Sequence, residues 1–160
     1  MDLNSEQKEI VELFLRQEFL IGKLYKLFSF RYPEYKAFWT EMATEEHLHA
    51  TWIKRLIDTD KFRFSQGELR ANYLASSIKN IEELAEEVKN NREFSMTQAV
   101  SMALRIERSL YEKEIFQSFE GDSEQVSKML YSLCVEQQIH IKKMEKFASS
   151  FSQIKAVHDK

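Results

Sequence analysis

The sequence predicts an all-α protein built as a four-helix bundle. Its 160 residues include only three Gly and one Pro, against 43% hydrophobic and 31% charged residues. This composition leaves little material for turns and suits long helices with charged outer faces. Apolar residues also recur at helical spacing over several long stretches. A chain of this length forms one domain with a real core, so residues 1–160 are treated as a single domain.

Two long helices are predicted in the first third of the chain. The first runs from about Ser5 to Phe30, and its apolar face is formed by Ile10, Leu13, Phe14, Ile21, Leu24, Tyr25 and Phe28. Pro33 marks a break, because the residue before a proline is pushed out of the α region. Proline itself suits a first helical turn, so the second helix is expected from Pro33 to about Asp58.

Two more long helices are predicted after a connection. Residues 59–76 lack a clean period, with room for one short helical turn, and Ser76 and Ser77 should then cap a shorter acidic helix. Ser95 and Gln98 have the spacing of a capping box that starts a third long helix, running to about Glu120 before Gly121. The fourth runs from the Asp122-Ser123 cap to about Phe151. The prediction is two helix hairpins joined by a long crossover, the ferritin-like arrangement.

Composition also limits the classes of function. The single Cys134 excludes an internal disulfide and any Cys-x-x-Cys site, which fits a cytoplasmic location. The amino terminus is polar and acidic, unlike a signal peptide, and no apolar run approaches the roughly 20 residues that span a membrane. With 23 basic and 26 acidic residues, a net charge of -3 and no basic stripe, we expect neither nucleic acid nor a membrane as a partner.

Two glutamates stand on apolar helix faces. Glu18 shares its face with Phe14, Ile21 and Tyr25, and Glu107 has similar apolar neighbours on the third long helix. Burying an unpaired charge costs several kcal/mol, so each carboxyl group must be protonated, paired or bound to a cation.

The second and fourth helices carry a polar pair on their inward faces. In EEHLHA, Glu46 and His49 are three residues apart, which places a carboxylate beside an imidazole. In EQQIHI, Gln137 and His140 repeat that spacing. Each long helix thus offers a polar group near its middle, and the two hairpins form a weak internal repeat.

A glutamate from each of two helices and Glu-x-x-His from each of two others is a ligand set for a pair of iron or manganese ions. With MATEEHLHA at positions 42–50, the chain resembles the rubrerythrin and ferritin-like di-iron carboxylate superfamily over about residues 5–150. The resemblance implies that Glu18 is a terminal ligand and that Glu46 and Glu107 are bridging carboxylates. It assigns one imidazole to each metal, from His49 and His140.

The sequence departs from that family at three points. Gln137 stands where rubrerythrins have glutamate, and a neutral amide offsets no charge, so the metal position beside Gln137 and His140 should be the weaker. Glu136 is a candidate to compensate, whereas Glu45 is expected to point outward. Leu110 replaces a further glutamate, and the rubredoxin module of typical rubrerythrins is missing, so electrons must come from another protein.

The resemblance implies a soluble di-iron oxidoreductase that reduces peroxide or dioxygen, with two irons per chain and manganese or zinc as other candidates. Tyr25 and Tyr111 are the candidate catalytic side chains, donating to ligands or relaying electrons, although core packing is the simpler role for aromatic residues. His47 lies off the ligand face. Two alternatives remain: a protein that stores, senses or delivers one metal, and a metal-free bundle that binds a partner. Exposed apolar positions also predict a homodimer.

Overall fold

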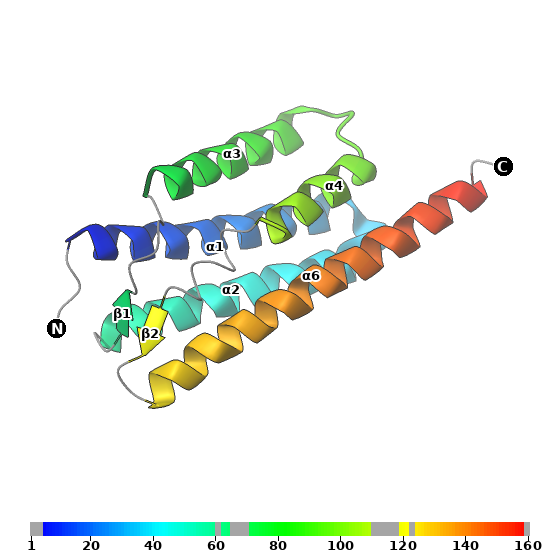
Figure 1. Ribbon diagram of the computed structural model, residues 1–160. Coiled ribbons are helices and arrows are strands. Elements are labelled where there is room, and N and C mark those ends of the chain that lie inside the picture. Colours follow the sequence, from blue (N-terminus) through cyan, green and yellow to red (C-terminus); the bar gives the residue numbers. More distant parts are fainter. Residues whose placement is uncertain (1–4, 60–61, 65–70, 110–118, 122–123, 159–160) are drawn as a thin grey trace.

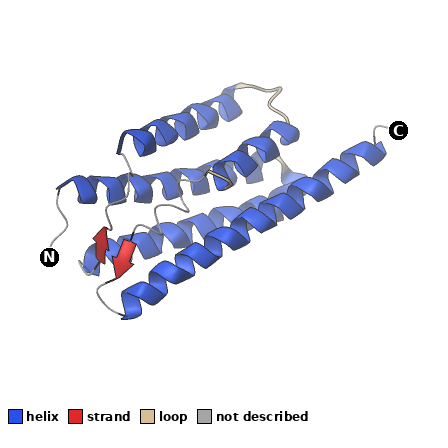
Figure 2. Ribbon diagram, viewed as in Figure 1, coloured by secondary structure: helices blue, strands red, loops and turns tan. Residues whose placement is uncertain are grey.

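The computed structural model describes residues 5–59, 62–64, 71–109, 119–121 and 124–158 (Figure 1). Helices dominate these ranges, with two short strands at one end of the molecule (Figure 2). The elements are α1 (Ser5–Arg31), η1 (Pro33–Tyr35), α2 (Lys36–Thr59), β1 (Phe62–Phe64), α3 (Ala71–Asn90), α4 (Met96–Glu107), β2 (Phe119–Gly121) and α6 (Glu124–His158). The prediction of an all-α bundle is confirmed. No helix in the described ranges is both long and apolar enough to cross a membrane.

The predicted first hairpin is formed by α1 and α2, which pack along one another. The break falls where it was predicted, with Pro33 in the first turn of the short 3-10 helix η1. A close approach of the two helices is centred on Gly22. A Cβ atom there would lie 3.1 Å from His47 Nδ1 and 3.3 Å from both Ala43 O and Glu46 Cβ. Glycine at this position therefore brings α1 directly against the turn of α2 that carries the candidate ligand Glu46.

The crossover helix α3 packs on α1. It begins at Ala71, so the prediction that Ser76 and Ser77 cap it is wrong: both lie inside the helix, and Ser76 Oγ bonds to Asn72 O. The physical reason is the buried face of α3, which starts with Leu74 before the serines and includes Ile78, Ile81 and Val88.

The turn after α3 is fixed to the end of α1 by Arg31. Its guanidinium donates hydrogen bonds to the carbonyl oxygens of Val88, Asn91, Arg92 and Phe94, at 2.7–3.3 Å. Helix α4 then starts with the predicted capping box: Gln98 N donates to Ser95 Oγ, and Ser95 N donates to the Gln98 side chain. This pair of reciprocal bonds sets the direction in which α4 leaves the turn.

The prediction of one helix from Ser95 to Glu120 is wrong. Helix α4 ends at Glu107, where the Arg108 N–H bonds back to Leu104 O and Ile106 O. Residues Phe119–Gly121 form β2, which pairs antiparallel with β1 so that Gly121 faces Phe62. Strand pairing between segments this far apart leaves no trace in helical periodicity, although aromatic residues do favour strands. Helix α6 is also longer than predicted, because it continues past Phe151 to His158.

The apolar core forms two clusters separated along the helices. One includes Phe14, Ile53 and Leu133, and the other includes Tyr25, Trp39 and Met144. On α1, α2 and α6 the sequence between these clusters carries the polar residues of the predicted ligand set. The bundle therefore buries a polar layer between two apolar ones.

Candidate metal centre

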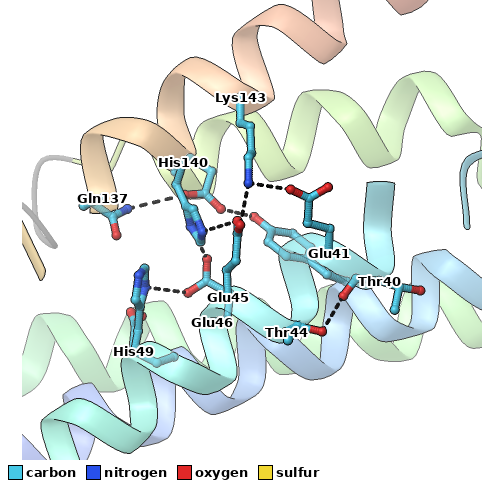
Figure 3. Close-up of polar contacts among 12 residues, drawn as sticks. Thr40, Glu41, Thr44, Glu45, Glu46, His49, Gln137, His140 and Lys143 are labelled. Atoms are coloured by element: carbon cyan, nitrogen blue, oxygen red, sulfur yellow. Dashed lines mark hydrogen bonds and ion pairs between the residues drawn. The ribbon is translucent and has the colours of Figure 1, made fainter. Parts of the chain in front are cut away.

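Helices α1, α2, α4 and α6 bring all six predicted ligands together in the buried polar layer. Figure 3 shows four of them, Glu46, His49, Gln137 and His140, pointing into the space between α2 and α6. None of the six is more than 3% exposed: Glu18 0%, Glu46 1%, His49 2%, Glu107 2%, Gln137 3% and His140 1%. Groups of this polarity reach such burial only when their neighbours, or a bound ion, compensate the lost water.

Glu46 lies between the two imidazoles. Its Oε1 is 2.8 Å from His140 Nδ1, and its Oε2 is 3.5 Å from His49 Nδ1. One ligand atom from each of Glu46, His49 and His140 can be chosen so that all three lie within 4.8 Å of one another. These three residues form a buried group that could hold a metal ion.

The other two carboxylates flank the imidazoles. Glu18 Oε2 is 3.4 Å from His49 Nδ1, and Glu107 Oε2 is 3.8 Å from His140 Nδ1. Glu107 also accepts two hydrogen bonds: Tyr25 Oη donates to Oε1 at 2.6 Å, and Gln137 Nε2 donates to Oε2 at 3.4 Å. The two ends of the site therefore differ, because Glu107 has neutral donors around it.

The carboxyl groups have very different pKa values. Burial and the negative charge of Glu46 raise the pKa of Glu18 to about 7 and that of Glu107 to about 8. Burial acts in the same direction on Glu46, but the His140 and His49 imidazoles outweigh it and lower its pKa to about 2. Glu46 is thus the permanent anion of the site at neutral pH, and the outer two carboxyl groups retain their protons more readily.

Both imidazoles favour their protonated forms. Burial alone would lower the pKa of His49, but Glu18 and Glu46 raise it to about 10. Burial likewise opposes the charge on His140, and Glu46 and Glu107 raise its pKa. The positive charge that balances the carboxylates is supplied here by protons, and a metal ion would have to displace them.

Several polar atoms of the site make no hydrogen bond of good geometry in the described part of the chain, although ion-pair contacts connect most of them. They include Glu18 Oε1 and Oε2, Glu46 Oε2, and the Nδ1 atoms of His49 and His140. Each of these atoms is a good metal ligand, and an unsatisfied buried polar group costs about 1–3 kcal/mol. The donor set therefore fits a metal ion, which would supply the well-placed partner that these atoms lack.

Glu45 corrects a sequence prediction. It was expected to point outward, but its Oε2 lies 2.7 Å from His140 Nε2, on the side of the ring away from Glu46. Its Oε1 is bound by Lys143 Nζ, which also reaches Glu41 Oε1 at 2.7 Å (Figure 3). The spacing was informative, since Glu41 and Glu45 are four residues apart on α2 and Lys143 is three residues after His140 on α6.

The remaining predictions have mixed outcomes. Glu136 was the candidate to compensate for Gln137, but it makes no ion pair or hydrogen bond with the site among the described residues. His47 is exposed, as expected, and Cys134 is half-buried against the core. Tyr111 and Leu110 lie outside the described residues. Tyr25, the other candidate catalytic residue, is fully buried and touches Glu107.

Comparison of the chain with protein-family models, with curated proteins and with solved structures found no match. What the site does must therefore be argued from its own geometry.

Proposed function

We propose that the chain is a ferritin-like di-iron protein of the rubrerythrin type, which reduces peroxide or dioxygen with electrons from an external donor protein. One observation carries the proposal. Three carboxylates and two imidazoles from four helices are buried together, and Glu18, which makes no hydrogen bond of good geometry among the described residues, has the His49 imidazole 3.4 Å away. A buried carboxylate in this condition is costly unless a cation is its normal partner.

The side chains divide into two sets that share Glu46. Glu18 and His49 stand on the side of Glu46 Oε2, and Glu107 and His140 stand on the side of Glu46 Oε1. This division supports two metal positions, with Glu46 as the carboxylate common to both. Gln137 belongs to the second position and brings no charge to it.

Two bound ferrous ions would supply the two electrons that peroxide or dioxygen accepts. The protein residues have supporting roles. Tyr25 holds a proton on Oη, 2.6 Å from Glu107, and orients that carboxylate. Glu45 orients the His140 ring through Nε2, which leaves Nδ1 facing the site. The apolar clusters on either side keep bulk water away from the polar layer.

The test is elemental analysis after anaerobic loading with ferrous iron, followed by addition of hydrogen peroxide. We expect close to two irons per chain and oxidation of both on the time scale of mixing. Absence of bound iron together with absence of any peroxide reaction would overturn the proposal. A melting temperature that is the same with iron, with chelator and with neither would instead support a metal-free bundle. A ligand that binds only the folded state must raise the melting temperature.

A second candidate is a protein that binds one metal for storage, sensing or delivery. The contact between Gln137 Nε2 and Glu107 Oε2 favours it, because the amide then offers its donor rather than its oxygen to the second position. One metal per chain and no peroxide turnover would select this candidate over the first.

A further inference from the structure

A cleft lies over α1, between α3 and α4. The two helices are joined by the turn that Arg31 fixes, and α3 packs on α1 (Figure 1). The cleft has a volume of about 580 Å³, and its walls include Ser77, Ile81 and Leu84 of α3 and Met102, Arg105 and Ile106 of α4. This volume is within the range of roughly 300–1,000 Å³ that is usual for small-molecule sites.

Gln17 of α1 also lines the cleft. It is only 2% exposed, and its Oε1 has no hydrogen-bond partner among the described residues. A buried amide oxygen without a partner lowers stability, and methionine or leucine at the same position would avoid that cost. The unused acceptor therefore points to a ligand that donates a hydrogen bond in the cleft.

The cleft and the metal centre are at the same level of the bundle. Gln17 directly precedes Glu18, and Ile106 directly precedes Glu107. Successive Cα atoms are about 3.8 Å apart, and successive helical side chains diverge by roughly 100°. Each helix thus directs one residue to the cleft and the next to the buried carboxylate layer, so the cleft and the carboxylate layer lie on adjoining faces of α1 and α4.

The lining indicates a neutral, partly apolar ligand. Ile81, Leu84 and Ile106 offer apolar contacts, neutral polar side chains such as Ser77 and Asn80 share the walls, and the charged residues have both signs, with Arg105 on α4 and Glu83 and Glu87 on α3. Hydrogen peroxide is far smaller than this cleft. Resting on the proposed function, we infer that the cleft binds an organic hydroperoxide, whose O–H donates to Gln17 Oε1 and whose hydrocarbon part contacts the apolar walls.

The reaction balances as two-electron reduction. The hydroperoxide ROOH takes two electrons and two protons, its O–O bond breaks, and an alcohol ROH and water are released. With iron held by the candidate ligands, oxidation of two ferrous ions to ferric would supply the two electrons, and the external donor would return them. Two solvent protons enter the products.

The first test needs no metal. The probe is 2-phenyl-2-propanol, the alcohol product of cumene hydroperoxide, titrated into metal-free protein and followed through the methyl signals of Ile81, Met102 and Ile106. We expect saturable binding of one molecule per chain. Gln17→Met keeps the size of the side chain but removes the acceptor, so affinity should fall about fivefold, while the melting temperature stays the same or rises. Unchanged affinity in Gln17→Met, or no saturable shift in these signals, would overturn the inference.

Two neighbouring serines provide a matched pair of variants. Ser77 lines the cleft, whereas Ser76 is exposed and outside it. Ser77→Trp should abolish binding of the alcohol, and Ser76→Trp should leave it unchanged. With iron bound, Ser77→Trp should slow oxidation by cumene hydroperoxide at least tenfold and leave oxidation by hydrogen peroxide unaltered.

The two proposals fail in different ways. If the alcohol binds but neither peroxide oxidises bound iron, the cleft is a binding site for small organic molecules and the proposed function is wrong. If hydrogen peroxide reacts but the alcohol does not bind, or Ser77→Trp slows both peroxides equally, the inference fails and the proposed function stands. Should Ser77→Trp not fold, the Gln17→Met titration decides the matter alone.

Discussion

The two halves of the candidate metal centre have the same plan but different chemistry. The α1–α2 hairpin supplies Glu18, Glu46 and His49, and α4 with α6 supplies Glu107, Gln137 and His140. In the first half Glu18 forms an ion pair with His49 at 3.4 Å, while in the second Glu107 accepts hydrogen bonds from Tyr25 and Gln137. The first carboxylate thus faces a cationic partner, and the second is partly satisfied by neutral donors.

Removing the shared carboxylate should have the largest effect, because it damages both halves at once. Glu46→Gln keeps the shape but removes the anion between His49 and His140. We expect at least a hundredfold loss of affinity for ferrous iron at both positions, measured by competition with a chelating dye. Glu41→Gln, on the same helix but bonded to Lys143 on the outer side of the site, is the control and should bind as the wild type does. Equal binding in both variants would remove Glu46 from the site.

Replacing Gln137 by glutamate should make the two metal positions similar in affinity. Gln137→Glu is expected to tighten the second position about tenfold or more, raising the iron count toward two per chain where the wild type falls short. Without metal, the extra buried carboxylate beside Glu107 should lower the melting temperature. Elemental analysis and thermal melts with and without iron measure both effects. A variant that is as stable as the wild type without iron and binds no more of it would contradict the assigned role of Gln137.

Removing the carboxylate that orients the His140 ring should lower metal affinity at the second position only. Glu45→Gln replaces the carboxylate 2.7 Å from His140 Nε2, and outer partners of this kind typically change metal affinity by about 10- to 100-fold. Titration with ferrous iron should show one weakened position and one unchanged. Weakening of both positions to the same extent would mean that Glu45 acts on the fold as a whole.

The smallest predicted effect is a pH dependence of the metal-free protein. The pKa of His49 is raised from 6.5 to about 10, so its contribution to stability is complete below pH 6.5 and is lost as the pH rises toward 10. The raised pKa of Glu107, about 8, also makes the folded state bind its proton more tightly than the unfolded chain, so stability falls from pH 4.5 to 8. We expect the melting temperature to fall by about 5 °C between pH 6 and 9.

Two variants test the origin of that pH dependence. Glu107→Gln should reduce the loss of thermal stability above pH 7 more than Glu18→Gln does. The pKa of Glu18 is about 7, so most of its contribution is already lost at that pH. Thermal melts over this range in chelator-treated protein are the measurement. A melting temperature that is constant from pH 6 to 9 would show that the buried groups do not titrate as described.

The sequence was sufficient to predict that most of the candidate ligands are buried together, for a physical reason. Glu18, Glu46, Glu107 and the two histidines are polar residues on apolar helix faces, and helical geometry alone puts such faces inside a bundle. The hairpin of α1 and α2 was predictable in the same way, because Pro33 marks its turn.

The features that were missed depend on contacts between distant segments. Glu45 is drawn inward by Lys143 and His140 of α6, and no property of α2 alone reveals that partner. Strand β2 exists through its pairing with β1, so the prediction that Phe119 and Glu120 are helical was wrong. The start of α3 before Ser76 was missed because a possible cap was weighted above the apolar face that includes Leu74.

The close approach at Gly22 has a consequence for metal choice. Glu18 and Glu46 come from different helices, and the separation of those helices is limited at Gly22, where a Cβ atom would stand 3.3 Å from Glu46 Cβ. A Cβ atom at this position would require its neighbours on α2 to move by a few tenths of an ångström, and a shift of α2 itself would widen the distance between the two carboxylates. The ionic radius that a metal centre here would accept therefore depends in part on a residue that has no side chain and binds nothing.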